Sequence, residues 1–216
     1  MSNTIAQNAR TFNLHPEVAV RSESALAWSY RHVGCPDISD KSLIVLRERI
    51  SQGHLILRGT AAVLNGAARE VIGLALPNCP NGLTQDETGK YSIQWLSPDE
   101  WLLILPGGKE FAQEGKLREA LGDQHYAIIN VTGGQTLIEL EGDKTRELLM
   151  KSTPYDVHPD AFPVGKGVTT TFAKSSLILR RPTEQRWELV LRRSFADYLY
   201  RWILDAGSEY AIGVDT

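Results

Sequence analysis

The strongest constraint on the fold of this chain is an alternation of paired strand-like segments with helix-like segments. The strand-like segments are rich in Leu, Ile and Val, and short polar or glycine-containing turns join them. Short links favour antiparallel neighbours, because a parallel pair needs a long crossover connection. The expected strands span 43–49, 54–58, 91–96, 100–105, 126–131, 135–141, 168–173, 176–180 and 187–192. This order predicts an α+β fold of antiparallel sheets with helices packed on one face, rather than a doubly wound α/β fold.

Two of the turns between strands contain glycine. Residues 51–53 (SQG) follow the first expected strand and give a hairpin-like signature with the strand at 54–58. Residues 132–134 (TGG) connect the strands at 126–131 and 135–141 in the same way. We therefore expect the two strands on either side of each turn to be antiparallel neighbours.

Helical spacing of apolar residues appears between the strand pairs. The expected helices span 61–74, 109–121, 143–150 and 194–206. Thr60, Asp143 and Ser194 are the candidate N-caps, and Gly122 and Gly207 lie just past the ends of two helices. One apolar stripe in the last helix, which is typical of a core-facing side, contains Phe195, Leu199, Trp202, Ile203 and Ala206.

The first part of the chain differs from the rest. Residues 1–40 are polar and irregular, and we interpret them as an N-terminal arm. Within this arm Leu26, Trp28 and Tyr30 are too apolar to be left fully exposed. The arm is therefore expected to lie on a partner or on the body of the fold, with a disordered tail as an equal alternative.

The chain length of 216 residues is sufficient for one large domain or for two small ones packed together. Pro and Gly are frequent in the connection 154–167, which marks the expected boundary. We expect a first α+β subdomain at 41–150 and a second at 151–216, made of a strand meander and the C-terminal helix.

Charge gives no indication of a nucleic-acid partner. The chain has 23 Lys and Arg against 26 Asp and Glu, a formal net charge of −3. Its densest basic segment contains Arg180, Arg181, Arg186, Arg192 and Arg193. Glu184 and Glu188 interrupt this segment, and Trp187 alone is available there for base stacking. A protein interface, where arginine is enriched, explains the segment best, and a solvated face is the alternative.

The chain also carries no signature of a membrane or secreted protein. Cys35 and Cys79 are the two cysteines, and we expect both to be unpaired thiols in a reducing cytosol. The N-terminal residues lack the continuous apolar core of a secretory signal. No apolar run approaches the roughly 20 residues that a membrane helix needs. A cytoplasmic protein without membrane contact is the expectation.

No catalytic or metal-binding constellation stands out. The glycines at 107–108, 133–134, 165 and 167 match neither GxGxxG nor GxxxxGK[ST], so a flavin or nicotinamide held by this chain alone is not expected. The five histidines lack metal-ligand spacing. His158 follows Asp156 in a loop, where an Asx-type turn is favoured; a Ser-His-Asp triad stays open, although there is no GxSxG elbow. We assign no catalytic residue, no metal ligand and no cofactor-binding residue.

Two tryptophans lie close to one turn. Trp95 and Trp101 flank the turn formed by residues 96–100. Each indole is large enough to anchor either a core or a partner surface.

Several blocks together resemble a known family. They are 95–103 (WLSPDEWLL), 130–136 (NVTGGQT), 141–149 (EGDKTRELL), 156–159 (DVHP), 162–165 (FPVG), 169–171 (TTT) and 193–196 (RSFA), in this order. These blocks are similar to the gamma subunit of heterotetrameric sarcosine oxidase. The agreement runs from about residue 55 to the C-terminus, and the first block is the most specific.

The resemblance implies a fold like that of the aminomethyltransferase (T-protein) of the glycine cleavage system. It implies a non-catalytic subunit that works with alpha, beta and delta subunits. The assembly would be an oxidoreductase acting on CH–NH donors, which demethylates sarcosine to glycine with production of hydrogen peroxide and folate-linked capture of the one-carbon unit. FAD, FMN, NAD and tetrahydrofolate are then expected mostly on the other subunits. Whether this chain has activity on its own stays open.

The alternative is a stand-alone protein of the same superfamily, either a folate-binding aminomethyltransferase-like protein or an iron–sulfur maturation protein. The maturation proteins carry a Lys-Gly-Cys block. In this chain Lys166 and Gly167 are followed by Val168, so the cysteine is missing and that alternative is weakened.

Overall fold

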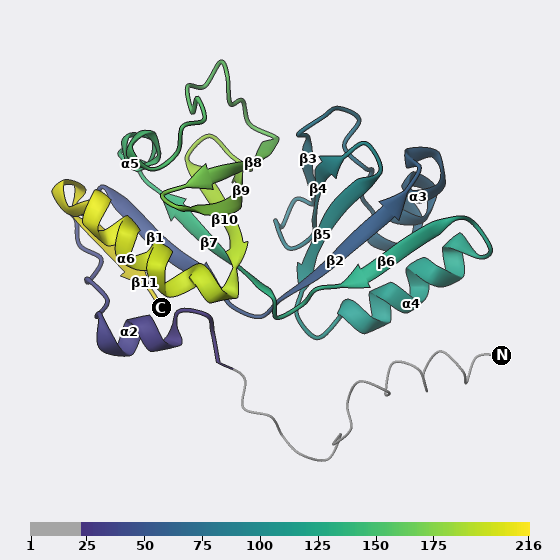
Figure 1. Ribbon diagram of the computed structural model, residues 1–216, viewed down its shortest axis with the longest axis horizontal. Coiled ribbons are helices and arrows are strands. Elements are labelled where there is room, and N and C mark those ends of the chain that lie inside the picture. The colour runs from purple at the N-terminus through teal and green to yellow at the C-terminus, as the bar shows by residue number, and fades with distance from the viewer. Residues whose placement is uncertain (1–22) are drawn as a thin grey trace, which may run out of the picture.

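Two sheets lie in the middle of the molecule, and helices cover the outer face of each (Figure 1). The computed structural model describes residues 23–216. The larger sheet, sheet A, has the strand order β11-β1-β7-β10-β9-β8. Its strands are β1 (Ile44–Arg49), β7 (Gln135–Glu141), β8 (Lys166–Phe172), β9 (Ser175–Arg181), β10 (Arg186–Arg192) and β11 (Ile212–Asp215). All neighbouring strands are antiparallel except β1 and β11, which are parallel.

The smaller sheet, sheet B, is antiparallel throughout and has the order β3-β4-β5-β2-β6. Its strands are β2 (Gln52–Gly59), β3 (Leu83–Gln85), β4 (Ser92–Ser97), β5 (Glu100–Pro106) and β6 (Tyr126–Asn130). The predicted α+β architecture with antiparallel-rich sheets is confirmed. The sequence did not predict β3 and β11, because segments of three and four residues give too little alternation to be seen.

The two glycine-containing turns are corners between the sheets, not hairpins. β1 pairs with β7 in sheet A, whereas β2 pairs with β5 and β6 in sheet B. The expectation that β1 neighbours β2, and β6 neighbours β7, is therefore wrong. At each of these corners the chain passes from one sheet to the other. The two corners are neighbours, because the Val131 amide near the second corner donates to the His54 carbonyl near the first at 2.9 Å. The pairing partner of a strand depends on distant segments, which a local turn sequence does not specify.

The first corner requires a glycine at position 107. Ser51 has a positive φ of 57°, and its carbonyl accepts a hydrogen bond of 2.8 Å from the Gly107 amide. A Cβ atom on residue 107 would lie 2.1 Å from that carbonyl oxygen. Gly107, which lacks a Cβ atom, thus permits close contact of two backbones.

Helices close the outer face of sheet B. They are α3 (Ala61–Ala67), which continues as a π-helix at Ala68–Ile72, and α4 (Glu110–Leu121). The predicted cap at Thr60 is confirmed, since its side chain accepts from the Val63 amide. Gly122 follows the end of α4 as predicted.

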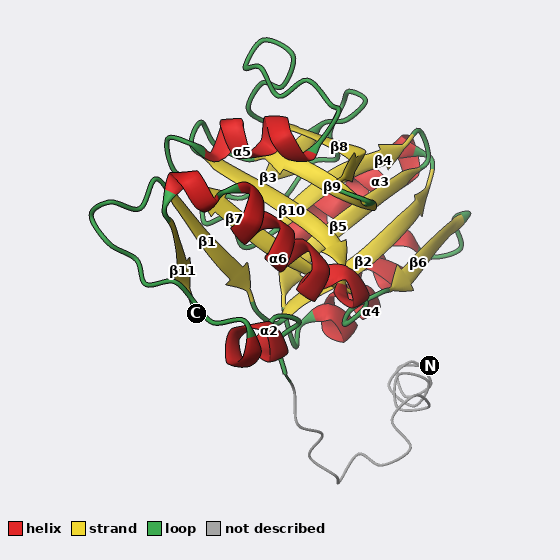
Figure 2. Cartoon of the chain, turned by 60° about the vertical axis from the view of Figure 1, so that its left-hand side comes forward, coloured by secondary structure: helices red, strands yellow, loops and turns green. Residues whose placement is uncertain are grey.

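Two further helices close the outer face of sheet A. α5 (Thr145–Ser152) and α6 (Ala196–Ala206) cross this face in Figure 2. The predicted caps at Asp143 and Ser194 are wrong: α5 begins after Lys144, α6 begins after Phe195, and neither has a side-chain cap. A 3₁₀ turn at Arg193–Phe195 precedes α6 and contains Ser194.

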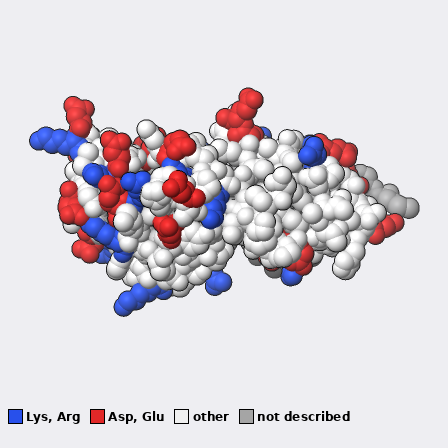
Figure 3. All heavy atoms as spheres, turned by 90° about the horizontal axis from the view of Figure 1, so that it is seen from above, with Lys and Arg blue, Asp and Glu red and all other residues white. Residues whose placement is uncertain are grey.

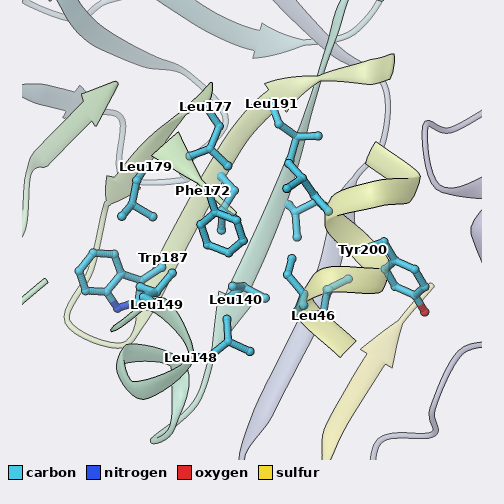
Figure 4. Packing of buried hydrophobic residues seen from close by; sticks show 14 of the residues in the cluster. Leu46, Leu140, Leu148, Leu149, Phe172, Leu177, Leu179, Trp187, Leu191 and Tyr200 are labelled. Atoms are coloured by element: carbon cyan, nitrogen blue, oxygen red, sulfur yellow. The ribbon is translucent and has the colours of Figure 1, made fainter. Parts of the chain in front are cut away.

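Apolar side chains form one core under each helix layer and a third layer between the sheets. In Figure 4 Leu46, Leu140 and Trp187 from sheet A face Leu148 and Leu149 of α5. The layer between the sheets contains no helix residue and consists of Leu102, Ile104, Leu137, Ile178 and Val190, with Ile56 and Leu96 packed against them. This third layer joins two halves that each have a core of their own.

The N-terminal arm lies on the body of the fold as far as the structure describes it. Its helix α2 (Ala27–His32) contacts α6, and Leu26 and Ser29 are fully buried. The arm's first 22 residues, and the expectation for them, lie outside the described part of the chain. Cys35 and Cys79 are free, as predicted. Within residues 23–216 no helix is both long and apolar enough to span a bilayer.

The two sheets do not divide the chain at residue 150. β1 and β7 precede the expected boundary, yet both pair within the sheet that holds β8, β9 and β10. The half around sheet B is instead one continuous insertion between β1 and β7. The loop at 154–167 lies within the half that contains sheet A, and it does not mark a boundary between the two halves. In Figure 3 the charged side chains on the visible face gather over the half with sheet A.

The burial of Leu26 gives a direct test of arm docking. Leu26→Ala should lower the free energy of unfolding by about 2–5 kcal/mol, because it opens a cavity in the core under α6. Ile38→Ala in the same arm should cost less than half of this, since Ile38 is 50% exposed. Urea unfolding of the three proteins measures both values. Equal, small losses would contradict docking of the arm.

Candidate functional site

A cavity of about 250 Å³ lies at the corner where the chain crosses between the sheets. The arm, both corners and the start of α4 together form its wall. The segments that contribute are 23–25, 48–52, 54, 107–108, 110, 132–133, 135–136 and 193. Both chain connections between the two halves, at residues 50–51 and 132–133, therefore contribute to this cavity.

Glu48 closes one side of the cavity. Its carboxylate accepts hydrogen bonds from the Ala25 amide at 2.9 Å, the Leu26 amide at 3.3 Å and the Thr136 hydroxyl at 2.7 Å. Glu48 is 6% exposed, and no Lys, Arg or His of the described chain forms an ion pair with it. Three donors stabilise this buried carboxylate, and they also fix the arm to β1 and β7.

Glu110 also lines the cavity, but no backbone amide or hydroxyl of the described chain donates to its Oε2 atom. It is the first residue of α4, where the helix dipole favours a negative charge. It is 8% exposed, and its Oε2 atom has no hydrogen-bond partner in the described chain. A Cβ atom on Gly53 would lie 3.2 Å from this oxygen, so the glycine leaves room for the carboxylate.

His54 lies between the cavity and the layer that joins the sheets. It is 1% exposed, and neither ring nitrogen has a partner within residues 23–216. Burial, and secondly the positive charge of Arg180, lower the pKa of His54 to about 4. The imidazole is therefore neutral at neutral pH, with one donor and one acceptor nitrogen.

Arg180 forms a buried ion pair with Glu188 behind His54. Its Nε donates to Glu188 at 2.9 Å, and its NH2 group donates to the Ser92 hydroxyl of sheet B at 3.1 Å. Arg180 and Glu188 are 2% and 4% exposed. The Gln94 amide adds a second polar link, because it donates to the carbonyls of Gly82 and Gly167 at 3.1 and 3.0 Å.

Further charges continue this polar row across sheet A. Glu139 is 3% exposed and pairs with Arg49 at 3.0 Å and with Arg47 at 3.5 Å. Arg47 donates in turn to Asp215 of β11 at 2.7 Å. The face of sheet A that is turned toward sheet B thus combines apolar and paired charged side chains.

The basic segment at 180–193 is divided between interior and surface. Arg180 and Arg181 are buried, and Arg181 donates to the Phe162 carbonyl at 2.8 Å. Arg193 is exposed and donates to the carbonyls of Glu23 and Ser24 in the arm. The interpretation of these residues as one interface or one solvated face is therefore wrong for the first two, which hold the fold together.

His158, Trp95 and Trp101 are not among the residues that line the cavity. The His158 amide donates to Asp156 at 2.9 Å, which confirms the Asx-type turn. Trp95 and Trp101 face each other across β4 and β5, and Trp101 is 2% exposed, so it anchors the core of sheet B.

Sequence reasoning missed Glu48, His54 and Glu110. For Glu48 a signal was available in the alternation of side chains along β1. Ile44 and Leu46 face the core, and Glu48 is the next residue on the same face of the strand. A charged residue in a core-facing position indicates a buried polar site. No such pattern marks Glu110, because its burial depends on the distant residue Gly53.

Neither a metal ion nor a flavin fits the residues of this cavity. In the part of the chain that the structure describes, no three His, Cys, Asp or Glu side chains lie close enough to hold a metal. Pockets for cofactor-sized ligands are typically about 300–1,000 Å³, larger than this one. The chemistry that the cavity supports is binding of a small polar molecule.

Comparison with known proteins assigns the family. The family model described as "Sarcosine oxidase, gamma subunit family" matches residues 58–209. The chain belongs to the sarcosine oxidase gamma subunit family. A gamma subunit of sarcosine oxidase from Corynebacterium sp. (strain P-1) is 37% identical over 145 residues, which cover 67% of this chain and 70% of that protein.

Solved structures agree with this family and with the predicted fold. A chain of the heterotetrameric sarcosine oxidase from Corynebacterium sp. U-96 superposes with a TM-score of 0.77 at 28% identity, covering 88% of this chain and 96% of that one. Aminomethyltransferase T of the glycine cleavage system from Bartonella henselae superposes with a TM-score of 0.61 at 13% identity, covering 88% of this chain and 58% of that one. The second similarity confirms the T-protein-like fold of this gamma-family chain.

The neutral, buried state of His54 predicts a pH dependence of stability. Its pKa is about 4 in the folded chain and about 6.5 in an unfolded one, so below pH 6.5 the unfolded state binds more protons. The free energy of unfolding should fall by up to about 1.4 kcal/mol per pH unit between pH 6.5 and 4 through this group. Above pH 6.5 its contribution should be constant.

Denaturant unfolding between pH 4 and pH 8 measures this dependence. His54→Gln should flatten the curve in that window. The control His158→Gln should leave it unchanged, since the side chain of His158 is 62% exposed. An identical slope in wild type and His54→Gln would contradict the assignment.

Proposed function

We propose that this chain is the gamma subunit of a heterotetrameric sarcosine oxidase and works beside alpha, beta and delta subunits. The observation that carries the proposal is the match to a chain of such an enzyme over 96% of that chain's length. The activity of the assembly would be the oxidative demethylation of sarcosine to glycine, with hydrogen peroxide as a product and folate-linked capture of the one-carbon unit.

Within this assembly the chain has a structural role. The corner cavity is below the usual size of a cofactor pocket, and the glycines of the chain match no phosphate-binding loop. We therefore expect FAD, FMN, NAD and tetrahydrofolate mostly on the other subunits. The contribution of this chain is a folded surface on which the larger subunits assemble, in the cytoplasm.

An aromatic patch on the outside of the arm and α6 suits such a contact. Trp28, Phe195 and Tyr198 are 49%, 41% and 36% exposed. The Arg201 guanidinium lies 5.5 Å from the centre of the Trp28 ring. Tyr198 and Arg201 are three residues apart on one side of α6, and Phe195 lies in the 3₁₀ turn that precedes the helix.

This patch corrects one prediction and supports the proposal. Leu199 and Ile203 are buried as expected from the helical stripe, but Phe195 is exposed, because it lies in the 3₁₀ turn before α6. Trp, Tyr, Phe and Arg are enriched at protein interfaces and among the residues that dominate binding energy. We expect the patch to face one of the larger subunits.

Co-expression with the alpha, beta and delta chains tests the proposal. The wild-type chain should co-purify with the flavin-containing subunits in one complex that oxidises sarcosine. Phe195→Ser combined with Tyr198→Ser should weaken the association at least tenfold, because each lost anchor costs about 1 kcal/mol or more. Phe111→Ser is the matched control, since Phe111 is 54% exposed on α4 in the other half.

Two results would contradict the proposal. One is a wild-type chain that stays monomeric in the presence of all three partners. The other is tight binding of tetrahydrofolate by the isolated chain, which would favour the stand-alone folate-binding alternative.

A further inference from the structure

Two buried carboxylates line the corner cavity, and no cation of the described chain neutralises either. Glu48 and Glu110 are 6% and 8% exposed. We infer that this cavity binds a small organic ammonium ion. The inference is independent of the proposed assembly, because it rests on side chains of this chain alone.

The unmet hydrogen-bonding groups of the cavity are mainly acceptors. Glu48 already receives three hydrogen bonds, whereas the Oε2 atom of Glu110 and the Oε1 atom of Gln135 receive none. The neutral His54 ring offers one further acceptor nitrogen and one donor. Leaving buried acceptors unsatisfied is costly, and a charged acceptor costs most. An ammonium group supplies several N–H donors and the missing positive charge together.

The arginines at the cavity are already committed to other groups. Arg49 donates to Glu139 at 3.0 Å. Arg193 donates to the main-chain carbonyls of Glu23 and Ser24 at 2.6 and 3.2 Å. The charge of Arg49 is therefore balanced by a carboxylate, whereas Arg193 keeps its charge because its partners are neutral carbonyls. The carboxylates of Glu48 and Glu110 outnumber this one remaining cation at the cavity. This balance favours a cationic ligand over an anion.

The size of the cavity limits the ligand to roughly ten heavy atoms, since a cavity of about 150 Å³ holds benzene. A volume of about 250 Å³ exceeds that of a single water molecule, which occupies roughly 30 Å³ in the liquid. It is below the range of cofactor-sized pockets. The absence of a metal-binding group of side chains within residues 23–216 favours an organic cation over a metal ion. The ligand class is therefore a short alkylammonium ion with free N–H donors.

Titration of the full-length chain with methylammonium chloride tests this inference. Tetramethylammonium chloride, which has the charge but no N–H donor, and sodium chloride at equal ionic strength are the comparison salts. We expect saturable shifts of the His54 and Gly53 amide signals in NMR spectra, with a rise in the melting temperature, for methylammonium alone. No saturable response, or an equal response to tetramethylammonium, would overturn the inference.

Two variants test whether methylammonium binds beside Glu110. Glu110→Gln should weaken methylammonium binding at least tenfold while keeping a melting temperature equal to or above that of the wild type without ligand. Glu119→Gln, an exposed glutamate on the same helix, should bind like the wild type. Unchanged binding by Glu110→Gln would overturn the site. If that variant fails to fold, the comparison of the two cations on the wild type still decides.

The same titration on an assembled complex identifies the source of the ammonium group. If the natural ligand is a free amine, methylammonium should also bind the cavity in the assembled complex. A lysine side chain of another subunit would fill the cavity there, and methylammonium would then bind only the isolated chain.

Discussion

The layer between the two sheets is the interaction on which the rest of the structure depends. Leu102 and Ile104 of sheet B meet Leu137, Ile178 and Val190 of sheet A in a layer without any helix residue. Each half has a helix-covered core of its own, so this layer decides whether the halves form one body. Polar links through Arg180 to Ser92, and through Gln94 to Gly167, fix how the halves are placed. Hydrogen bonds of this kind require a defined distance and angle, so they favour one placement of the halves.

The cavity and the proposed role in an assembly follow from this arrangement. The chain crosses between the sheets at two adjacent corners, and the arm and α4 close around them. Backbone and side chains there cannot all find partners, which leaves His54, Glu110 and Gln135 unsatisfied beside a small space. The same rigid body carries exposed aromatic residues on the arm and α6. A member of the sarcosine oxidase gamma subunit family thus combines a scaffold, a surface and a small polar cavity.

The local features of the fold could be predicted from the sequence, but the partners of the strands could not. The strand segments, the cap at Thr60 and the end of α4 follow from patterns within a few residues. The corners at 51 and 132–134 have the composition of hairpin turns, and only the pairing of β1 with β7 shows that they are not. The buried site was missed for the same reason, since Glu110 meets Gly53 across 57 positions of sequence. Arg180 and Arg181 were predicted to lie at the surface, because sequence composition does not reveal that a charged residue is buried.

Native-state hydrogen exchange tests most directly whether the two halves form one cooperative body. The amides to compare are those of β5 in sheet B and β10 in sheet A. Each strand packs one face against the helix-covered core of its own half and the other face against the shared layer. If the shared layer joins the halves, the slowest amides of both strands should exchange with the same free energy, within about 1 kcal/mol, because both need global unfolding. A free energy several kcal/mol lower for one strand would show that its half opens alone, and would contradict the central role of the layer between the sheets.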